Sequence, residues 1–400
     1  MKGKILLYST MLLLFVGLIA ISTSQALTPK EELGKKIFFD ENLSINSNQS
    51  CATCHAQGAG WTGPDSSINA HGAVYEGSIP GAFGDRKPPS SAYATQSPVL
   101  HVDKKGLFTG GNFWDGRATG ERLGSAAAEQ ALGPFLNPKE QALGSPEDVV
   151  TRVCSSSYAT LFMNVWGSEV CTGDVASAYD KIGYSIAAYE ASTEVNAFSS
   201  KYDYSLPGKA QLTKQERKGL ALFQGKGKCS KCHVIDGRAP LFTDFTYDNL
   251  GVPKNPENPV YDDNPTFVDL GLGGFLATRP DYAKYADANM GKHKVPTLRN
   301  VDLRDFDGGV KAYGHNGYFK SLEGIVHFYN TRDVKPVCPG PYTEAEAREA
   351  NCWPAPEVAQ NVNTAELGDL KLTEEDEAAI VAFLKILSDG YEPPLPKKKK

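Results

Sequence analysis

Two short segments combine cysteine and histidine at a spacing that suits one particular chemistry. They are Cys51-Ala52-Thr53-Cys54-His55 and Cys229-Ser230-Lys231-Cys232-His233, two copies of Cys-x-x-Cys-His. The two thiols of such a motif can add across the vinyl groups of one porphyrin, and the histidine that follows can bind its iron. The alternatives are structural disulfides or zinc, but zinc needs four ligands brought together and neither requires this histidine. The motifs predict two covalently bound hemes c, held by Cys51, Cys54, His55, Cys229, Cys232 and His233.

The segments around the two motifs also repeat. Residues 28–38 and 213–223 both begin with threonine, carry glutamate three residues later, and end in an apolar pair. Threonine followed by glutamate at this spacing is a capping box, which begins a helix. Later in each half, residues 174–194 and 373–389 have apolar side chains at helical spacing. The sequence therefore predicts a duplicated unit and a mainly α fold, with two cytochrome-c-like helical heme domains.

Length and composition suit two such domains. A chain of 400 residues has room for two or three domains, and its 39 glycines and 25 prolines predict long loops between the helices. We expect an N-terminal heme domain over residues 27–200, a C-terminal heme domain over 205–392, and a linker between them. Residues 393–400 form a basic tail. With 47 acidic and 41 basic residues the chain has a net charge of −6, which argues against nucleic acid as a partner.

The first residues indicate export. Lys2 and Lys4 precede an apolar run over residues 5–21, which is followed by Ser24-Gln25-Ala26. Basic residues, an apolar run and a small-x-small site are typical of a signal peptide, so we expect residues 1–26 to be removed. An uncleaved anchor helix is the alternative, because the run is close to the length that spans a bilayer. Either way the predicted location is periplasmic.

Four cysteines remain outside the heme motifs. Cys154 and Cys171 lie close together in the sequence, and so do Cys338 and Cys352. In an oxidising compartment each pair would close a short loop as a disulfide. Free buried thiols are the alternative, because the pairing geometry is not visible in a sequence.

Four further segments resemble the bacterial diheme cytochrome c peroxidase and MauG superfamily over nearly all of the mature chain. They are Phe113-Trp114-Asp115-Gly116-Arg117-Ala118, Glu129-Gln130-Ala131-Leu132-Gly133-Pro134 with Asn137-Pro138-Lys139-Glu140, Val295-Pro296-Thr297-Leu298-Arg299-Asn300-Val301, and Gly314-His315-Asn316-Gly317. The resemblance implies that hydrogen peroxide reacts at the N-terminal heme. It also implies that the C-terminal heme stores or relays electrons.

The resemblance assigns three residues to catalysis. Gln130 and Glu140 stand at the spacing of the family's distal glutamine and catalytic glutamate, with Pro134 between them. A carboxylate beside a heme can take a proton from peroxide and return it to the departing oxygen, so Glu140 is the expected acid–base group. Trp114 resembles the tryptophan that lies between the two hemes and shortens the electron path. A tryptophan buried only for packing is the alternative for Trp114.

Two residues resemble ligands from different branches of the superfamily. Tyr329 occupies the position of the second heme's outer ligand and matches MauG-type enzymes, whereas other peroxidases have methionine there. A tyrosine ligand favours higher oxidation states of iron. His327 or Met290 is the alternative ligand. His71 follows His55 at the spacing of the histidine that blocks the first heme in resting peroxidases, and an ordinary loop histidine is its alternative.

The remaining histidines and a calcium site receive weaker expectations. His101, His293 and His315 are expected to be structural, with His315 near the second heme. Many relatives hold calcium between the domains, but here Lys87, Arg304 and Phe306 occupy positions where the family has other residues. Lysine and arginine offer no oxygen ligand, although backbone carbonyls could serve, so the sequence leaves calcium open.

Three functions are consistent with these features. The first is an exported peroxidase that reduces hydrogen peroxide, with electrons from a small redox protein such as cytochrome c or a cupredoxin. The second is a MauG-like enzyme that oxidises tyrosine or tryptophan of a partner protein through a bis-Fe(IV) state. The third is an electron-transfer cytochrome without catalysis, which would not need Glu140 and Gln130. The sequence does not decide whether the protein forms a homodimer.

Overall fold

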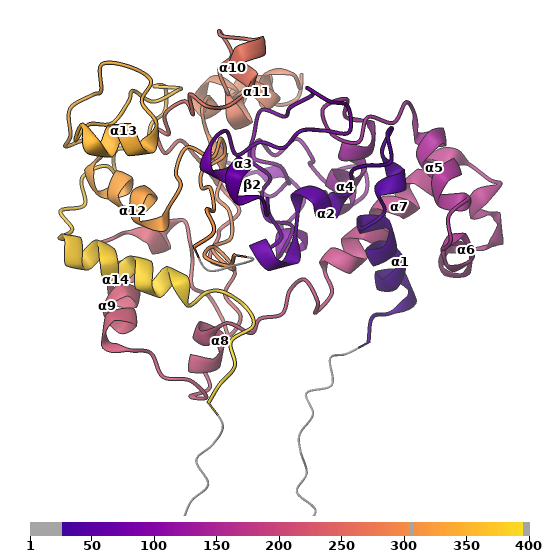
Figure 1. The fold of residues 1–400 in the computed structure, drawn as a ribbon, viewed down its shortest axis with the longest axis horizontal. Coiled ribbons are helices and arrows are strands. Elements are labelled where there is room, and N and C mark those ends of the chain that lie inside the picture. Colours follow the sequence, from indigo (N-terminus) through magenta and orange to yellow (C-terminus); the bar gives the residue numbers. More distant parts are fainter. Residues whose placement is uncertain (1–25, 305–307, 395–400) are drawn as a thin grey trace, which may run out of the picture.

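The computed structural model describes residues 26–304 and 308–394. Within these residues the chain is mainly helical, with long loops and two small antiparallel sheets (Figure 1). The predicted fold class is therefore confirmed. The predicted signal peptide lies outside the described residues except for Ala26, and so does most of the basic tail. No helix among the described residues is long and apolar enough to cross a membrane.

The helices fall into two sequential groups. The first group is α1 (Pro29–Phe38), α2 (Cys51–Cys54), α3 (Ser66–Ala70), α4 (Ala126–Leu136), α5 (Pro146–Cys154), α6 (Ala159–Trp166) and α7 (Val175–Glu190). The second group is α8 (Lys201–Ser205), α9 (Lys214–Gln224), α10 (Val260–Asp263), α11 (Gly271–Ala277), α12 (Leu322–Thr331), α13 (Glu344–Glu349) and α14 (Glu374–Lys385). Figure 1 shows α1 and α4 to α7 together on one side, and α9 and α12 to α14 on the other.

Each sheet is a pair of very short strands. Strand β1 (His101–Val102) pairs with β2 (Phe108–Thr109), with His101 opposite Thr109. Strand β3 (Tyr247–Asp248) pairs with β4 (His293–Lys294), with Asp248 opposite His293. The second pair ties two distant loops of the C-terminal half together.

The two predicted capping boxes begin α1 and α9. The Thr28 hydroxyl accepts from the Glu31 amide at 3.3 Å, while the Thr28 amide donates to the Glu31 carboxylate at 2.6 Å. Thr213 and Glu216 repeat both bonds, at 3.2 and 2.7 Å. Each box satisfies amides that have no partner within the helix. The predicted helix starts are therefore confirmed in both copies.

The same helix crossing occurs in both halves. Helix α1 packs on α7, and α9 packs on α14. Gly34 lies against the Ser185 carbonyl at the first crossing, and Gly219 lies against the Ala379 carbonyl at the second. A Cβ on either glycine would overlap that backbone oxygen. The duplication seen in the sequence is therefore a duplicated close contact, which only glycine permits.

Aromatic rings continue each crossing toward the core. Phe38 of α1 lies 5.6 Å from Tyr189 of α7, and Phe223 of α9 lies 5.2 Å from Phe383 of α14, measured between ring centres. One hydrophobic core draws its buried residues from positions 33–195 and a second from 202–387. The exact boundaries predicted for the two domains stay a prediction.

A short helix lies where the sequence predicted a linker. Ser200 and Asp203 form a capping box that begins α8. Asp203 then accepts two hydrogen bonds from the guanidinium of Arg299, which is almost fully buried. Tyr202 packs on Phe383 with ring centres 5.7 Å apart. The segment is ordered because its polar and aromatic side chains both find partners in the C-terminal half.

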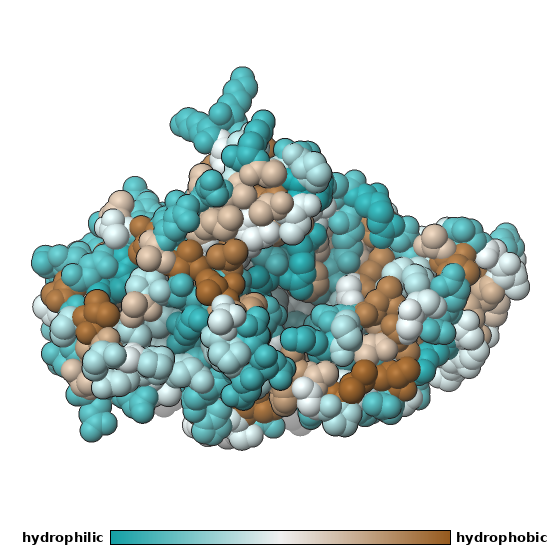
Figure 2. Space-filling model, turned by 90° about the horizontal axis from the view of Figure 1, so that it is seen from above, coloured by the Kyte–Doolittle hydropathy of each residue, from teal (hydrophilic) through white to brown (hydrophobic). Residues whose placement is uncertain are grey.

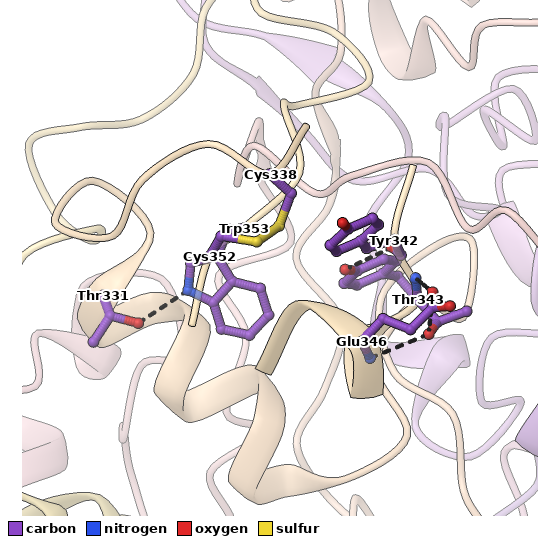
Figure 3. Close-up of a disulfide and its surroundings, with 8 residues drawn as sticks. Thr331, Cys338, Tyr342, Thr343, Glu346, Cys352 and Trp353 are labelled. Atoms are coloured by element: carbon purple, nitrogen blue, oxygen red, sulfur yellow. Dashed lines mark hydrogen bonds between the residues drawn. A yellow bond between two sulfur atoms is a disulfide. The ribbon is translucent and has the colours of Figure 1, made fainter. Parts of the chain in front are cut away.

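Both predicted disulfides are present. Cys154 is bonded to Cys171, and Cys338 is bonded to Cys352. Figure 3 shows the second disulfide beside Trp353, whose indole nitrogen donates to the Thr331 hydroxyl at 3.0 Å. Thr331 is the last residue of α12, so this disulfide loop is fixed to the helix that carries Tyr329.

Candidate active site with two heme cavities

The first Cys-x-x-Cys-His motif lines a cavity in the N-terminal half. Cys51 to Cys54 form α2, and His55 caps its C-terminal end. The His55 Nδ1 lies 3.2 Å from the Trp61 carbonyl oxygen. Because a carbonyl only accepts, Nδ1 carries the proton and Nε2 is free to bind a metal. Burial lowers the pKa of His55 to about 4, which keeps the ring neutral, as a metal ligand must be.

Gln130 and Glu140 line the same cavity. Gln130 comes from α4, and Glu140 comes from the loop that follows this helix. The Asn137 side chain donates to Glu140 Oε2 at 2.8 Å and so orients the carboxyl group. Burial raises the pKa of Glu140. Burial and then the charge of Glu140 raise the pKa of the Cys54 thiol to about 12, so the carboxyl group lies near the heme motif.

The second motif lines a cavity in the C-terminal half. Cys229, Cys232 and His233 all contribute to its wall. The His233 Nδ1 lies 2.8 Å from the Phe242 carbonyl oxygen, which again leaves Nε2 free. Burial lowers the pKa of His233. The two motifs therefore present their histidines in the same way.

Tyr329 lines the C-terminal cavity, and its two alternatives do not. Tyr329 projects from α12, and burial followed by the nearby Cys229 raises its pKa. His327, on the same helix, instead places Nδ1 3.1 Å from both carboxylate oxygens of Glu377. Met290 packs against the small cluster that includes Leu272. Of the three ligand candidates, all within the described residues, only Tyr329 reaches the cavity wall.

Trp114 lies between the two cavities. Its side chain is buried and contributes to both cavity walls, as well as to a smaller cavity between them. The indole nitrogen donates to the Lys87 carbonyl at 2.8 Å, and the Trp114 carbonyl accepts from the Lys294 amide at 2.8 Å. The ring is therefore held from the N-terminal half and the backbone of Trp114 from the C-terminal half.

The structure does not bring His71 to the N-terminal cavity. His71 ends the short helix α3, and its side chain is 70% exposed. Its Nδ1 lies 2.9 Å from a carboxylate oxygen of Glu257 in the C-terminal half. In this arrangement the ring pairs with Glu257 at the surface, and binding of the first iron by His71 stays a prediction.

Both cavities fit a heme c. Within the described residues, the four cysteines outside disulfides are those of the two motifs. Apolar side chains such as Phe223, Ile380 and Leu384 line the second cavity. Free thiols, an unoccupied histidine nitrogen and apolar walls are what covalent heme attachment requires.

Comparison with known proteins identifies the family. Residues 28–211 match the family profile described as di-haem cytochrome c peroxidase. The chain is 34% identical to the methylamine utilization protein MauG of Paracoccus denitrificans, over 94% of this chain and 93% of the relative. It is 30% identical to the cytochrome c551 peroxidase of Nitrosomonas europaea, over 76% and 75%. The chain belongs to the diheme cytochrome c peroxidase and MauG family.

Solved structures agree with this assignment. The diheme peroxidase BthA of Burkholderia thailandensis matches with a TM-score of 0.75 and 30% identity, over 91% of this chain and 87% of that one. This member of the diheme peroxidase and MauG family is accordingly a peroxidase-type oxidoreductase with two hemes c. The predicted family, enzyme class and cofactors are confirmed.

Lys87 and Arg304, two of the residues that the sequence analysis counted against calcium, contact other groups in the structure. The buried Lys87 ammonium donates to Thr62 Oγ1 and to the Pro88 carbonyl, both at 2.9 Å, and burial lowers its pKa to about 7. Arg304 pairs with Asp302 at 3.1 Å. Phe306 lies outside the described residues. These contacts add no oxygen ligand from the side chains, and calcium stays an open prediction.

The structure places His293 and Glu190 in the cavity walls, where the sequence analysis did not expect them. His293 and His315 both line the C-terminal cavity, so His315 lies where it was expected and His293 joins it. Glu190 at the end of α7 is buried in the N-terminal cavity wall, and burial raises its pKa to about 8. Nothing in the sequence distinguishes Glu190 from a surface glutamate at a helix end, because its hydrogen-bond partner Ser91 is distant in the chain.

Proposed function

We propose that this protein is an exported, periplasmic peroxidase that reduces hydrogen peroxide to water in the N-terminal cavity. Electrons would come from a small redox protein, such as cytochrome c or a cupredoxin, through the C-terminal heme. The observation that carries the proposal is the placement of Glu140 and Gln130 in the cavity of the first heme motif. An electron carrier needs no buried acid–base group there, so this pair argues against the non-catalytic alternative.

Each motif would hold one heme. Cys51 and Cys54 would attach the first and His55 would bind its iron, while Cys229, Cys232 and His233 would do the same for the second. When bound, heme c supplies the redox chemistry of its iron. Hydrogen peroxide, two protons and two electrons then give two molecules of water, so the protein must deliver both protons and electrons to the N-terminal cavity.

Proton delivery is the proposed task of Glu140. Its carboxylate would take the proton from one peroxide oxygen and return it to the oxygen that departs as water. Asn137 supports this role, because it holds Oε2 and leaves Oε1 for peroxide. Gln130 has no charge and would orient peroxide through its amide group. Burial of Glu140 also supports the proposal, because a raised pKa suits an acid that must give its proton back.

Electron delivery is the proposed task of Trp114. The ring contributes to both cavity walls and offers an oxidisable aromatic group midway along the path. Its hydrogen bond to Lys87 and the backbone bond to Lys294 favour one fixed orientation. A fixed ring supports efficient transfer, because little rearrangement accompanies the gain or loss of charge.

A second candidate function is MauG-like oxidation of tyrosine or tryptophan in a partner protein. Tyr329 at the wall of the second cavity favours it, as does the distance of His71 from the first cavity. The relative from Paracoccus denitrificans, which is named for methylamine utilization, also supports it. In this second function Glu140 would again transfer the proton of peroxide. The electrons would come from a side chain of the partner protein.

One experiment separates these functions. Stoichiometric hydrogen peroxide is mixed with the diferric protein and with protein in which one heme has been reduced, while visible and EPR spectra are recorded. The proposed peroxidase should react only after one heme is reduced, and should then oxidise reduced cytochrome c continuously. Reaction of the diferric form would favour the MauG-like function. No reaction in either form would contradict both.

Replacing Tyr329 with phenylalanine tests the proposed outer ligand. We expect the visible spectrum and the reduction potential of the second heme to change, because phenylalanine offers no oxygen to the iron. Tyr313→Phe is the matched control: Tyr313 lines the same cavity, but its hydroxyl accepts from Arg304 at 3.2 Å. Unchanged spectra in Tyr329→Phe, with both hemes loaded, would remove Tyr329 as a ligand.

A further inference from the structure

Four side chains converge on the wall of the C-terminal cavity, next to the junction of the two halves. They are Asp269 from the loop before α11, His293 from β4, His315 from the Gly314–Gly317 turn, and Glu357 from the segment after the second disulfide. Ligand atoms of the first three all lie within 4.8 Å of one another. None of the four has a task in the proposed peroxide chemistry.

The distances link the four groups through Asp269 and His315. His293 Nε2 lies 3.3 Å from Asp269 Oδ2. His315 Nε2 lies 3.9 Å from the same oxygen and 3.9 Å from Glu357 Oε2. The two imidazole rings are stacked, with centres 3.5 Å apart and planes at 9°, so they present their Nε2 atoms side by side.

The position of the proton on His293 makes its contact with Asp269 unfavourable unless a cation lies between them. The His293 Nδ1 lies 3.2 Å from the Gly291 carbonyl, which only accepts, so Nδ1 carries the ring's proton. In the neutral ring the other nitrogen, Nε2, then has only a lone pair to offer. Its Nε2 lone pair therefore points at a carboxylate oxygen, and two acceptors meet without a hydrogen between them.

Three of the converging atoms have no hydrogen-bond partner among the described residues. They are His293 Nε2, His315 Nε2 and Glu357 Oε2. The side chains of His315 and Glu357 are only 6% and 3% exposed. Buried polar atoms are rarely left unpaired, because each one costs desolvation free energy. These atoms therefore indicate a bound group that supplies positive charge.

The carboxylates are already held in position from outside the cluster. Arg86 donates to both oxygens of Asp269 at 2.7 Å, and the Gly271 amide also donates to Oδ1. The Tyr261 hydroxyl and the Asp269 amide donate to Glu357 Oε1, which leaves Oε2 turned toward His315. Outer hydrogen bonds of this kind orient the ligands of metal sites.

We propose that Asp269, His293, His315 and Glu357 form a binding site for one divalent transition-metal ion of the zinc type. Two imidazole nitrogens with carboxylate oxygens are a ligand set that zinc accepts, in a four-coordinate site. Calcium is disfavoured, because it takes six to eight oxygen ligands. An anionic occupant is disfavoured as well, because it would face two carboxylates.

The local charge is compatible with a cation. Arg86 contacts the cluster through Asp269, and it is also paired with Asp115 at 2.6 Å. Arg117 shares Asp115 at 2.9 Å. The three carboxylates of Asp115, Asp269 and Glu357 therefore outnumber the two guanidinium groups. A divalent ion would reverse that excess, and the ligand carboxylates would compensate its charge directly.

Zinc binding to the mature protein with both hemes loaded tests the site. The protein is stripped with a chelator, dialysed and titrated with zinc chloride by calorimetry, and zinc and iron are then counted by mass spectrometry. We expect one tightly bound zinc for every two heme irons. His293→Gln and His315→Gln should each weaken binding by about 100-fold or more, since loss of an outer partner alone costs about 10- to 100-fold.

His101→Gln is the matched control. His101 is exposed, and its Nδ1 lies beside a carbonyl of its own loop at 3.0 Å, so zinc binding should not change. If either cluster variant fails to hold heme, Glu357→Gln replaces it, with a loss of about tenfold or more. Absence of tight zinc binding in the unmodified protein would overturn the proposal. Equal binding in the cluster variants and in His101→Gln would overturn it too.

Discussion

Replacing Glu140 with glutamine should lower the rate of the reaction with hydrogen peroxide by about 100- to 10,000-fold. Glutamine keeps the shape of the side chain and can still pair with Asn137, but it cannot take up and return a proton. The first heme should remain attached with an unchanged spectrum, because Glu140 belongs to the cavity wall and not to the Cys-x-x-Cys-His motif. Stopped-flow mixing with peroxide measures the rate directly.

Glu147→Gln is the control for this variant. Glu147 lies in the first turn of α5, close in sequence to Glu140, but its side chain is exposed and outside the cavity wall. It should react with peroxide at the normal rate. A normal rate in Glu140→Gln would remove Glu140 from the mechanism, and a slow rate in both variants would mean that the loss comes from general damage.

The same carboxyl group predicts a pH dependence. Burial raises the pKa of Glu140, so the carboxylate that accepts the proton is lost as the pH falls through this raised pKa. As the pH is lowered, the peroxide rate should therefore begin to fall while the pH is still higher than about 4.3, the usual pKa of an exposed glutamate. The residual rate of Glu140→Gln should lack this decline, since glutamine does not titrate.

Features that depend on neighbouring residues could be predicted from the sequence. Each heme motif, each capping box and each disulfide involves residues close together in the chain, and the structure has all of them where the pattern placed them. The duplication was visible for the same reason, since Gly34 and Gly219 recur at one spacing from their capping threonines.

Features that depend on residues far apart in the sequence could not be predicted from it. The outward position of His71 follows from Glu257, which is 186 residues away in the sequence. The pairing of Arg86 with Asp269, a residue of the proposed metal site, spans 183 residues. Local patterns hold no information about such pairs, so a loop histidine and a ligand histidine look alike in the sequence.

The helix crossing that recurs in both halves, α1 on α7 and α9 on α14, predicts a large loss of stability when its glycine is replaced. Gly34→Ala and Gly219→Ala should each destabilise the protein by about 3 kcal/mol or more, the upper part of the range for overpacked cores. The reason is that the new Cβ meets a backbone carbonyl, of Ser185 or of Ala379, which cannot rotate away as a side chain could. Thermal unfolding should shift down by about 6–12 °C.

The location of the damage distinguishes the two variants. In Gly34→Ala, hydrogen exchange should rise in α1 and α7, whereas in Gly219→Ala it should rise in α9 and α14, because each crossing belongs to its own core. Gly133→Ala is the control, since this glycine of α4 meets only the edge of Phe113 at 3.4 Å, and alanine favours a helix. If Gly34→Ala and Gly219→Ala are as stable as Gly133→Ala, the crossings are not the close contacts that make glycine necessary in both halves.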